Sequence, residues 1–178
     1  MSYYSNNITR LCELAFQAYA KQIGLANIPV SKIIAGFDDE NVPGPRLVFN
    51  CDNAEPEGPF DDANWSCHLE IQCATNCDDK SAVQHHAFSS EVFSQFFIGR
   101  YTIPDTITAA AASAVPYIPF ICWDIMTGRQ AKSIHERHWI SSLELMVKCC
   151  GGPIAEDLLS EGGLNLLSEE GRELTVEG

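Results

Sequence analysis

The chain has 178 residues, 46% of them hydrophobic and 20% charged, which is typical of one folded globular domain rather than of a disordered chain. A net charge of −13 with only 11 basic residues argues against a protein that binds nucleic acid by neutralising its phosphates. The sequence shows no basic, apolar leader of a signal peptide and no apolar run of the roughly 18 residues that a membrane span needs. We therefore expect an intracellular protein whose eight cysteines are reduced thiols without disulfides.

The first element is predicted to be an amphipathic helix. Ser5 or Asn7 can cap its N-terminus, and Gly24 ends it. One face of this helix should be buried, because its apolar residues have helical spacing. These residues are Ile8, Leu11, Leu14, Ala15, Ala18 and Tyr19.

Two short strands should follow this helix. Residues 33–37 and 46–51 are mostly apolar, and an acidic connection with Pro and Gly over 38–45 separates them. A hairpin or a sheet crossing fits this pattern. Residues 52–63 then place Pro and Gly among acidic side chains, which predicts an exposed loop.

The clearest strand signal covers residues 65–75. Odd positions there are apolar up to residue 73 and the even positions between them are polar, which is the period of two that a half-buried strand shows. This alternation predicts that Cys67 and Cys73 point into the core.

A second helix is predicted to end before Gly99, and either Asp78 or Asp79 can cap its start. Residues 106–114 predict a weaker helix or a loop of small residues. The buried stripe of the second helix should consist of Ala82, Val83, His86, Ala87, Ser90, Phe93 and Phe97.

The last two strands are predicted over 117–126 and 139–149, joined by a polar turn at 127–129. Together these elements predict an α+β domain over residues 1–150, with a mostly antiparallel or mixed sheet of four to five strands and two main helices packed on it. Residues 151–178 form an acidic C-terminal extension whose leucines should pack either on a neighbouring subunit or back on the domain. The core side of the final strand should be formed by Trp139, Leu143, Leu145, Val147 and Cys149.

Six residues near the middle of the chain have the side chains that a zinc site uses. Structural zinc sites come as paired knuckles on turns, and only Cys73 and Cys77 approach that spacing. Adjacent residues face opposite sides of a strand and lie about 100° apart on a helix, so the six should not converge. We expect buried thiols and surface histidines here, and no metal site. The six are Cys67, His68, Cys73, Cys77, His85 and His86.

No other motif predicts catalysis or a bound cofactor. The segment 135–138 has its histidines three residues apart, whereas the metalloprotease helix needs four, so a polar strand edge is expected there. Cys149 and Cys150 should give one core and one exposed thiol. Acidic runs at 38–40 and 61–62 fall in predicted loops and should be solvated. The sequence contains neither a nucleophile elbow nor a Gly-rich phosphate loop, so we predict a protein that is not an enzyme.

Three stretches carry a resemblance to a known family: residues 45–55, residues 64–71, and the run from Glu136 to Trp139 that leads into 143–149. The predicted elements around them run in the order helix, two strands, acidic segment, Trp-bearing strand, long helix and hairpin. This arrangement resembles the tail-terminator, or tail-completion, proteins of tailed bacteriophages.

The resemblance implies a structural virion protein that assembles in the bacterial cytoplasm. Such a protein forms a homohexameric ring at the head-proximal end of the tail tube, stops elongation of the tube and joins the head-completion or neck proteins. DNA would pass through an acidic lumen without specific binding, which the net charge suits. Contacts would come from the loops 38–45, 52–63 and 127–137 and from the C-terminal extension, with no membrane involved.

Three alternatives stay open from the sequence. Another head–tail connector, neck or tail-tube component would share the ring-forming character. An acidic DNA-mimic inhibitor would explain the charge, although it needs carboxylates regularly spaced on one face rather than grouped in loops. A zinc-dependent or thiol enzyme would require the cysteines and histidines to converge.

Overall fold

The computed structural model describes residues 7–37, 44–58, 61–78, 80–97 and 103–151. The predicted α+β class is confirmed, because one domain contains three α-helices and a five-stranded mixed sheet. Of the predicted C-terminal extension, all but Gly151 lies outside the described residues, as does most of the connection 38–45. In chain order, the elements are α1 (Ile8–Ile23), a 3-10 helix η1 (Val30–Lys32), β1 (Ile33–Ala35), β2 (Arg46–Gly58), β3 (Asp61–Asn76), α2 (Ala82–Phe97), α3 (Ile103–Ala112), β4 (Phe120–His135) and β5 (His138–Gly151).

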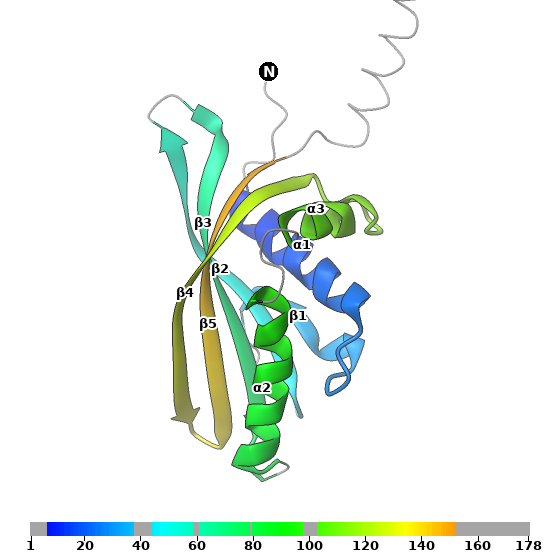
Figure 1. The fold of residues 1–178 in the computed structure, drawn as a ribbon, viewed down its shortest axis with the longest axis vertical. Coiled ribbons are helices and arrows are strands. Elements are labelled where there is room, and N and C mark those ends of the chain that lie inside the picture. Colours follow the sequence, from blue (N-terminus) through cyan, green and yellow to red (C-terminus); the bar gives the residue numbers. More distant parts are fainter. Residues whose placement is uncertain (1–6, 38–43, 59–60, 79, 98–102, 152–178) are drawn as a thin grey trace, which may run out of the picture.

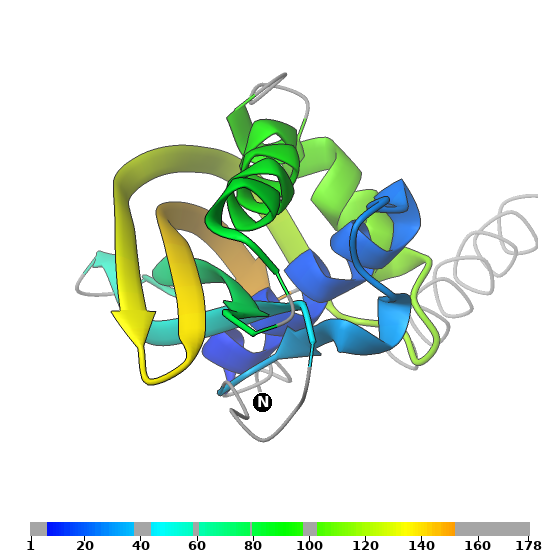
Figure 2. The same cartoon turned by 90° about the horizontal axis from the view of Figure 1, so that it is seen from below.

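The sheet has the strand order β1-β2-β3-β5-β4. The short strand β1 runs parallel to β2, and every other pair is antiparallel. β2 with β3 and β4 with β5 form two long hairpins. The end of β2 and the start of β3 lie at the opposite end of the molecule from the turn between β4 and β5 (Figure 1). The β4–β5 hairpin also bends strongly along its length (Figure 2). β4 is therefore an edge strand, and β1 covers only the first part of the other edge.

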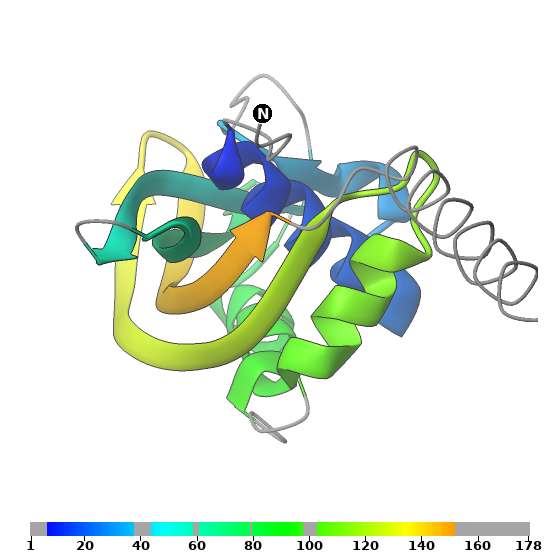
Figure 3. The ribbon, with the colours of Figure 1, turned by 90° about the horizontal axis from the view of Figure 1, so that it is seen from above.

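The core lies between one face of the sheet and the helices. α1 and α2 pack on this face, and α3 lies beside α1 near the start of β4 (Figure 3). Phe96 of α2 stacks on Phe16 of α1 with ring centroids 6.0 Å apart. The Phe96 ring also lies edge-on to the rings of Tyr19 and Phe49, with centroid distances of 5.8 and 6.3 Å. This aromatic cluster joins α1, α2 and β2, and such ring pairs add stability beyond the area that they bury.

The predicted first helix is confirmed in its bounds and its buried face. Asn7 caps it, because its side-chain oxygen accepts a hydrogen bond from the Arg10 N–H at 3.1 Å. Gly24 ends the helix with a positive φ of 65°, a conformation that costs glycine little. Of the predicted stripe, Leu14 and Ala18 are half-buried and the other members are buried.

The prediction of a loop over 52–63 is wrong. β2 continues to Gly58 and β3 begins at Asp61, so most of this segment belongs to a hairpin. β1 pairs only with residues 47–49, and no described strand pairs with the outer edge of β2 beyond them, where the Cys51 N–H donates to Glu13 of α1 at 3.0 Å. A strand edge without a partner strand tolerates proline and charged side chains, and two register shifts in this part of β2 relieve the ladder further. Pro56 and its acidic neighbours therefore lie in a strand rather than in a loop.

The predicted turn at 127–129 is also wrong. These residues lie inside β4, where the register shifts between Thr127 and Gln130, and the turn itself comes at Glu136 and Arg137. From Gly128 to Arg137 every side chain is exposed except half-buried Ala131. This half of the hairpin extends past the core, so burial does not impose an apolar alternation on its sequence.

The second helix exists as predicted, but its cap and its buried stripe differ. Ser81 and Gln84 form a reciprocal capping box, in which the Gln84 N–H donates to the Ser81 hydroxyl and the Ser81 N–H donates to Gln84 Oε1. Val83, His86, Ala87 and Ser90, all expected in the core, are exposed. The observed stripe is His85, Phe88, Ser89, Val92, Phe93 and Phe96. Among the residues whose burial the structure describes, which leaves out Phe97, it shares only Phe93 with the expected stripe.

Two weaker predictions are settled by the structure. The small-residue segment after residue 102 forms the helix α3, rather than a loop. The alternating strands are confirmed, because Cys67, Cys73, Leu145 and Val147 are fully buried. No helix among the described residues is both long enough and apolar enough to span a membrane.

Candidate functional site

The β4–β5 hairpin carries more than half of the large apolar side chains that are exposed among the described residues. Of their nine large apolar side chains that are exposed, five lie on this hairpin, with exposed fractions from 40 to 62%. Grouped apolar side chains at a surface are typical of a site that another protein covers. We call four of these five residues the hairpin surface: Ile121, Trp123, Met126 and Met146. The fifth, Ile134, is the cross-strand partner of Trp139 near the tip of the hairpin.

Two methionines form the centre of the hairpin surface. Met126 and Met146 are direct cross-strand partners. Leu145 and Val147, the neighbours of Met146 in β5, are buried against the helices, so both methionines lie on the opposite face of the sheet. Methionine side chains are flexible and adapt to a partner surface.

The outer edge of β4 is free over most of its length. No other described strand pairs with it. At its start, Thr108 of α3 covers the edge, because its hydroxyl accepts from the Cys122 N–H at 3.0 Å and lies 3.2 Å from the Cys122 carbonyl. Beyond this point the edge can accept a further strand, which is a common mode of protein association.

The two edge strands expose side chains of opposite sign. The end of β4 and the adjoining turn expose Arg129, Lys132 and Arg137, although Arg129 lies 3.7 Å from Glu144 and Arg137 lies 3.5 Å from Asp78. The part of β2 beyond residue 50 exposes Asp52, Glu55 and Glu57, although Asp52 lies 2.7 Å from His68 and Glu57 lies 2.7 Å from Lys148. The two edges therefore differ in the sign of their exposed side chains, and most of these charges also have partners within the subunit.

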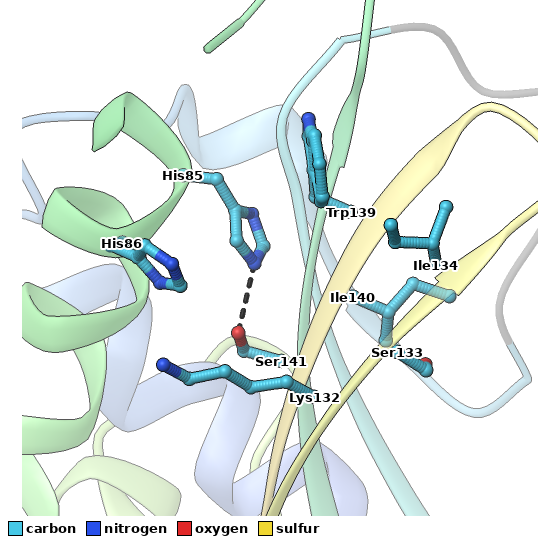
Figure 4. A pocket seen from close by; sticks show the side chains of 8 residues that line it. All are labelled: His85, His86, Lys132, Ser133, Ile134, Trp139, Ile140 and Ser141. Atoms are coloured by element: carbon cyan, nitrogen blue, oxygen red, sulfur yellow. Dashed lines mark hydrogen bonds between the residues drawn. The ribbon is translucent and has the colours of Figure 1, made fainter. Parts of the chain in front are cut away.

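A pocket of about 390 Å³ lies between the distal half of the hairpin and α2. Figure 4 shows its lining, with His85 pointing from α2 toward Ser141 on β5. The hairpin supplies Ile134, Trp139 and Ile140 as apolar walls and Lys132 as a positive charge.

His85 is held on both ring nitrogens. Its Nδ1 lies 2.9 Å from the Thr75 hydroxyl, and its Nε2 lies 2.9 Å from the Ser141 hydroxyl. Ser141 is only 1% exposed although it belongs to the lining of the pocket, and the group on the other side of the His85 ring is the Thr75 hydroxyl rather than a carboxylate. Both ring nitrogens of this buried histidine therefore have hydrogen-bond partners.

Burial lowers the pKa of His85 to about 4, and the nearby His86 and Lys132 contribute to the shift. The neutral ring is therefore built into the fold, and its contribution to stability is complete above pH 6.5 and is lost as the pH falls through 4. A His85 pKa of 6.5 in the unfolded chain and about 4 in the folded chain corresponds to a loss of about 3 kcal/mol in the free energy of unfolding. We expect urea unfolding at a series of pH values to show this loss.

The matched variants are His85→Gln and His86→Gln. His85→Gln should flatten the pH dependence between 6.5 and 4, because the titrating ring is gone. His86→Gln, at an exposed position one residue away, should keep most of it. An unchanged profile in His85→Gln would show that other groups cause the acid sensitivity.

The six zinc-type residues do not converge on one point, but the expectation of surface histidines is wrong for His85, which is buried. Cys67 points into the core, whereas its neighbour His68 lies on the opposite face, 2.7 Å from Asp52. Within the described segments, no group of potential metal ligands includes His68, Cys73, Cys77, His85 or His86. The expectation of one core and one surface thiol at 149–150 is close, because Cys149 is buried and Cys150 is half-buried.

The remaining candidate motifs lie in a hairpin turn, at the start of a strand and outside the described residues. The segment 135–138 forms the exposed turn of the β4–β5 hairpin. The acidic run 38–40 lies outside the described residues, and 61–62 begins β3.

Sequence reasoning missed two arrangements of side chains. One is the contact of His85 with Thr75 and Ser141, whose signal is a hydroxyl at an inward position of each strand. The other is a cluster of the thiols of Cys12, Cys51 and Cys67, whose sulfur atoms lie within 4.8 Å of one another. The signal for this cluster is a cysteine at an inward position of each of α1, β2 and β3.

Comparison of the chain with known protein-family models and with curated protein sequences found no match. The fold and the surfaces described above therefore carry the functional argument.

Proposed function

We propose that this protein is a structural subunit that assembles head-to-tail into a ring, and that the ring caps the head-proximal end of a phage tail tube. The observation that carries the proposal is the concentration of exposed apolar side chains on an edge strand, β4, that is free to pair. The resemblance of residues 45–55, 64–71 and 136–149 to tail-terminator proteins supports the same role.

The two free edges of the sheet explain how such a ring would form. The basic end of β4 in one copy would lie against the acidic outer edge of β2 in the next copy. An interface made of two different surfaces repeats from copy to copy, and it closes into a ring when the rotation between copies allows. Charge complementarity would fix the direction of assembly, and the hairpin surface would supply apolar contact.

Capping a tube requires no chemical step. One face of the ring must match the tube end, while the other must not bind a further tube subunit. The net charge of −13 supports a lumen that repels DNA, because acidic walls do not hold phosphates. In this proposal, neck or head-completion proteins bind the face that is directed away from the tube.

Tube length tests the proposal. Tail-tube subunits from the same phage genome would be polymerised with and without this protein, and tube lengths would be measured by electron microscopy. We expect shorter tubes whose growth stops as the ratio of this protein to tube ends rises. A length distribution unchanged by a large excess would contradict the terminator role, and would direct attention to other head–tail connector or neck functions.

A further inference from the structure

Four buried cysteines from four elements gather beneath α1. Cys12 comes from α1, Cys51 from β2, Cys67 from β3 and Cys149 from β5. The first three have their sulfur atoms within 4.8 Å of one another. The Cys149 sulfur lies 3.5 Å from that of Cys67. Residues distant in sequence thus bring their thiols to one point in the core.

These distances match the spacing of sulfur ligands around a metal ion. Tetrahedral Zn²⁺ with Zn–S bonds of about 2.3 Å places its sulfur atoms about 3.8 Å apart. The observed separations are 3.5 Å between Cys67 and Cys149 and at most 4.8 Å within the trio, so three sulfur atoms already lie near this spacing. Cys149 is not within 4.8 Å of every member of the trio, so its side chain has to rotate to complete the set.

We propose that Cys12, Cys51, Cys67 and Cys149 form a tetrathiolate site for Zn²⁺. Soft thiolate ligands favour zinc over harder cations such as Mg²⁺ or Ca²⁺. Four protein ligands leave no open position, so the site is structural rather than catalytic. Cys149 lies outside the mutually close trio, and its side chain turns toward the other three when the ion binds.

The site would tie the sheet to its main covering helix. Zinc binding contributes directly to folding, because the unfolded chain has no preformed site. Nearby, Glu13 accepts the Cys51 N–H at 3.0 Å and is itself held by Arg10 at 3.0 Å, which fixes the backbone at one ligand. This role is separate from ring assembly, because none of the four cysteines belongs to the hairpin surface.

Metal content of the full chain tests the site. The protein would be produced with zinc in the medium and purified without chelators, and its metal would be measured by mass spectrometry. We expect stoichiometric zinc, and with Co²⁺ in its place the intense visible absorption of tetrahedral thiolate coordination. Metal-free protein that takes up neither ion would overturn the proposal.

A matched pair of variants separates ligation from packing. Cys67→Ser and Cys73→Ser remove thiols on the same strand and the same face, both fully buried, but only Cys67 belongs to the cluster. Cys67→Ser should lose at least tenfold in zinc affinity, whereas Cys73→Ser should retain the ion. Equal zinc content in the two variants would overturn the assignment. If Cys67→Ser does not fold, Cys149→Ser gives the same comparison, with weakened binding as the expected result.

Discussion

Replacing Ile134 with Asp should abolish ring formation at tube ends while the subunit stays folded. Ile134 is 62% exposed near the tip of the β4–β5 hairpin, so its loss costs the isolated subunit little. In the proposed ring, the new carboxylate would lie in an apolar interface and face the acidic edge of β2. Burying an unpaired charge beside like charges should weaken each interface by about 2–4 kcal/mol, roughly 30- to 1,000-fold.

The control for this variant is Val83→Asp. Val83 is an aliphatic residue with 77% exposure near the start of α2, away from the edge of β4, and an acidic residue there suits the helix N-terminus. The fraction of tube ends that carry a ring, counted in electron micrographs, should fall close to zero for Ile134→Asp and stay unchanged for Val83→Asp. Equal capping by both variants would show that the end of β4 is not part of the subunit interface.

A second variant separates strand pairing from side-chain contact. His135 and His138 are the paired residues on either side of the two-residue turn of the hairpin. Counting back along β4 from His135, every second residue forms backbone hydrogen bonds with β5, and each residue between them directs its N–H group to the outer edge. By this count, Lys132 is directed outward. Lys132→Pro removes that donor and one basic charge without breaking the bonds to β5. Ring formation should fail in this variant if β4 pairs with the next subunit.

Replacing Phe96 with Ala should destabilise the fold by about 3–5 kcal/mol, the usual cost of removing a buried aromatic ring. Phe96 is 1% exposed and contacts the rings of Phe16, Tyr19 and Phe49, so the cavity would open between α1, α2 and β2 at once. Urea unfolding followed by circular dichroism gives the free energy of unfolding. A loss below about 1 kcal/mol would mean that α2 does not pack as described.

The conservative variant Phe96→Leu fills most of the same space and should cost less than Phe96→Ala. Val83→Ala, on the exposed side of the same helix, should change the free energy of unfolding by less than about 0.5 kcal/mol. This ordering follows from the burial of Phe96 and the exposure of Val83 on α2. If Val83 were buried, as the sequence pattern predicted, Val83→Ala would also destabilise the fold.

Elements with local signals could be predicted from the sequence. α1 has a cap at Asn7, an apolar stripe and a terminating glycine at Gly24, and all three signals act within one segment. β3 and the inner part of β5 alternate because one of their faces is buried along most of its length. In both cases the local pattern and the tertiary environment agree.

Predictions failed where the tertiary environment overrides the local pattern. His85 is polar, yet two hydroxyls from neighbouring strands satisfy both nitrogens and allow its burial, which rotates the core face of α2. Pro56 indicates a loop, yet it lies in the part of β2 whose outer edge is free. The local sequence shows neither the hydroxyls that bond His85 nor the lack of a strand beside this part of β2.

The candidate surfaces could not be predicted for a related reason. Trp123 and Met126 lie in an apolar strand segment and would be assigned to a core on sequence alone. The structure exposes them, and Met126 lies on the face of the sheet that is turned away from the helices. The thiol cluster likewise depends on α1 crossing the sheet at the point where β2, β3 and β5 each present a cysteine.

Single-particle electron microscopy of tube ends tests the central claim most directly. Tubes assembled from the tail-tube subunit of the same phage would be mixed with this protein and imaged. The account predicts a closed ring of copies at one end of each tube, in which β4 of one copy lies against β2 of the next. Tubes with bare ends, or copies bound singly along the tube wall, would contradict it.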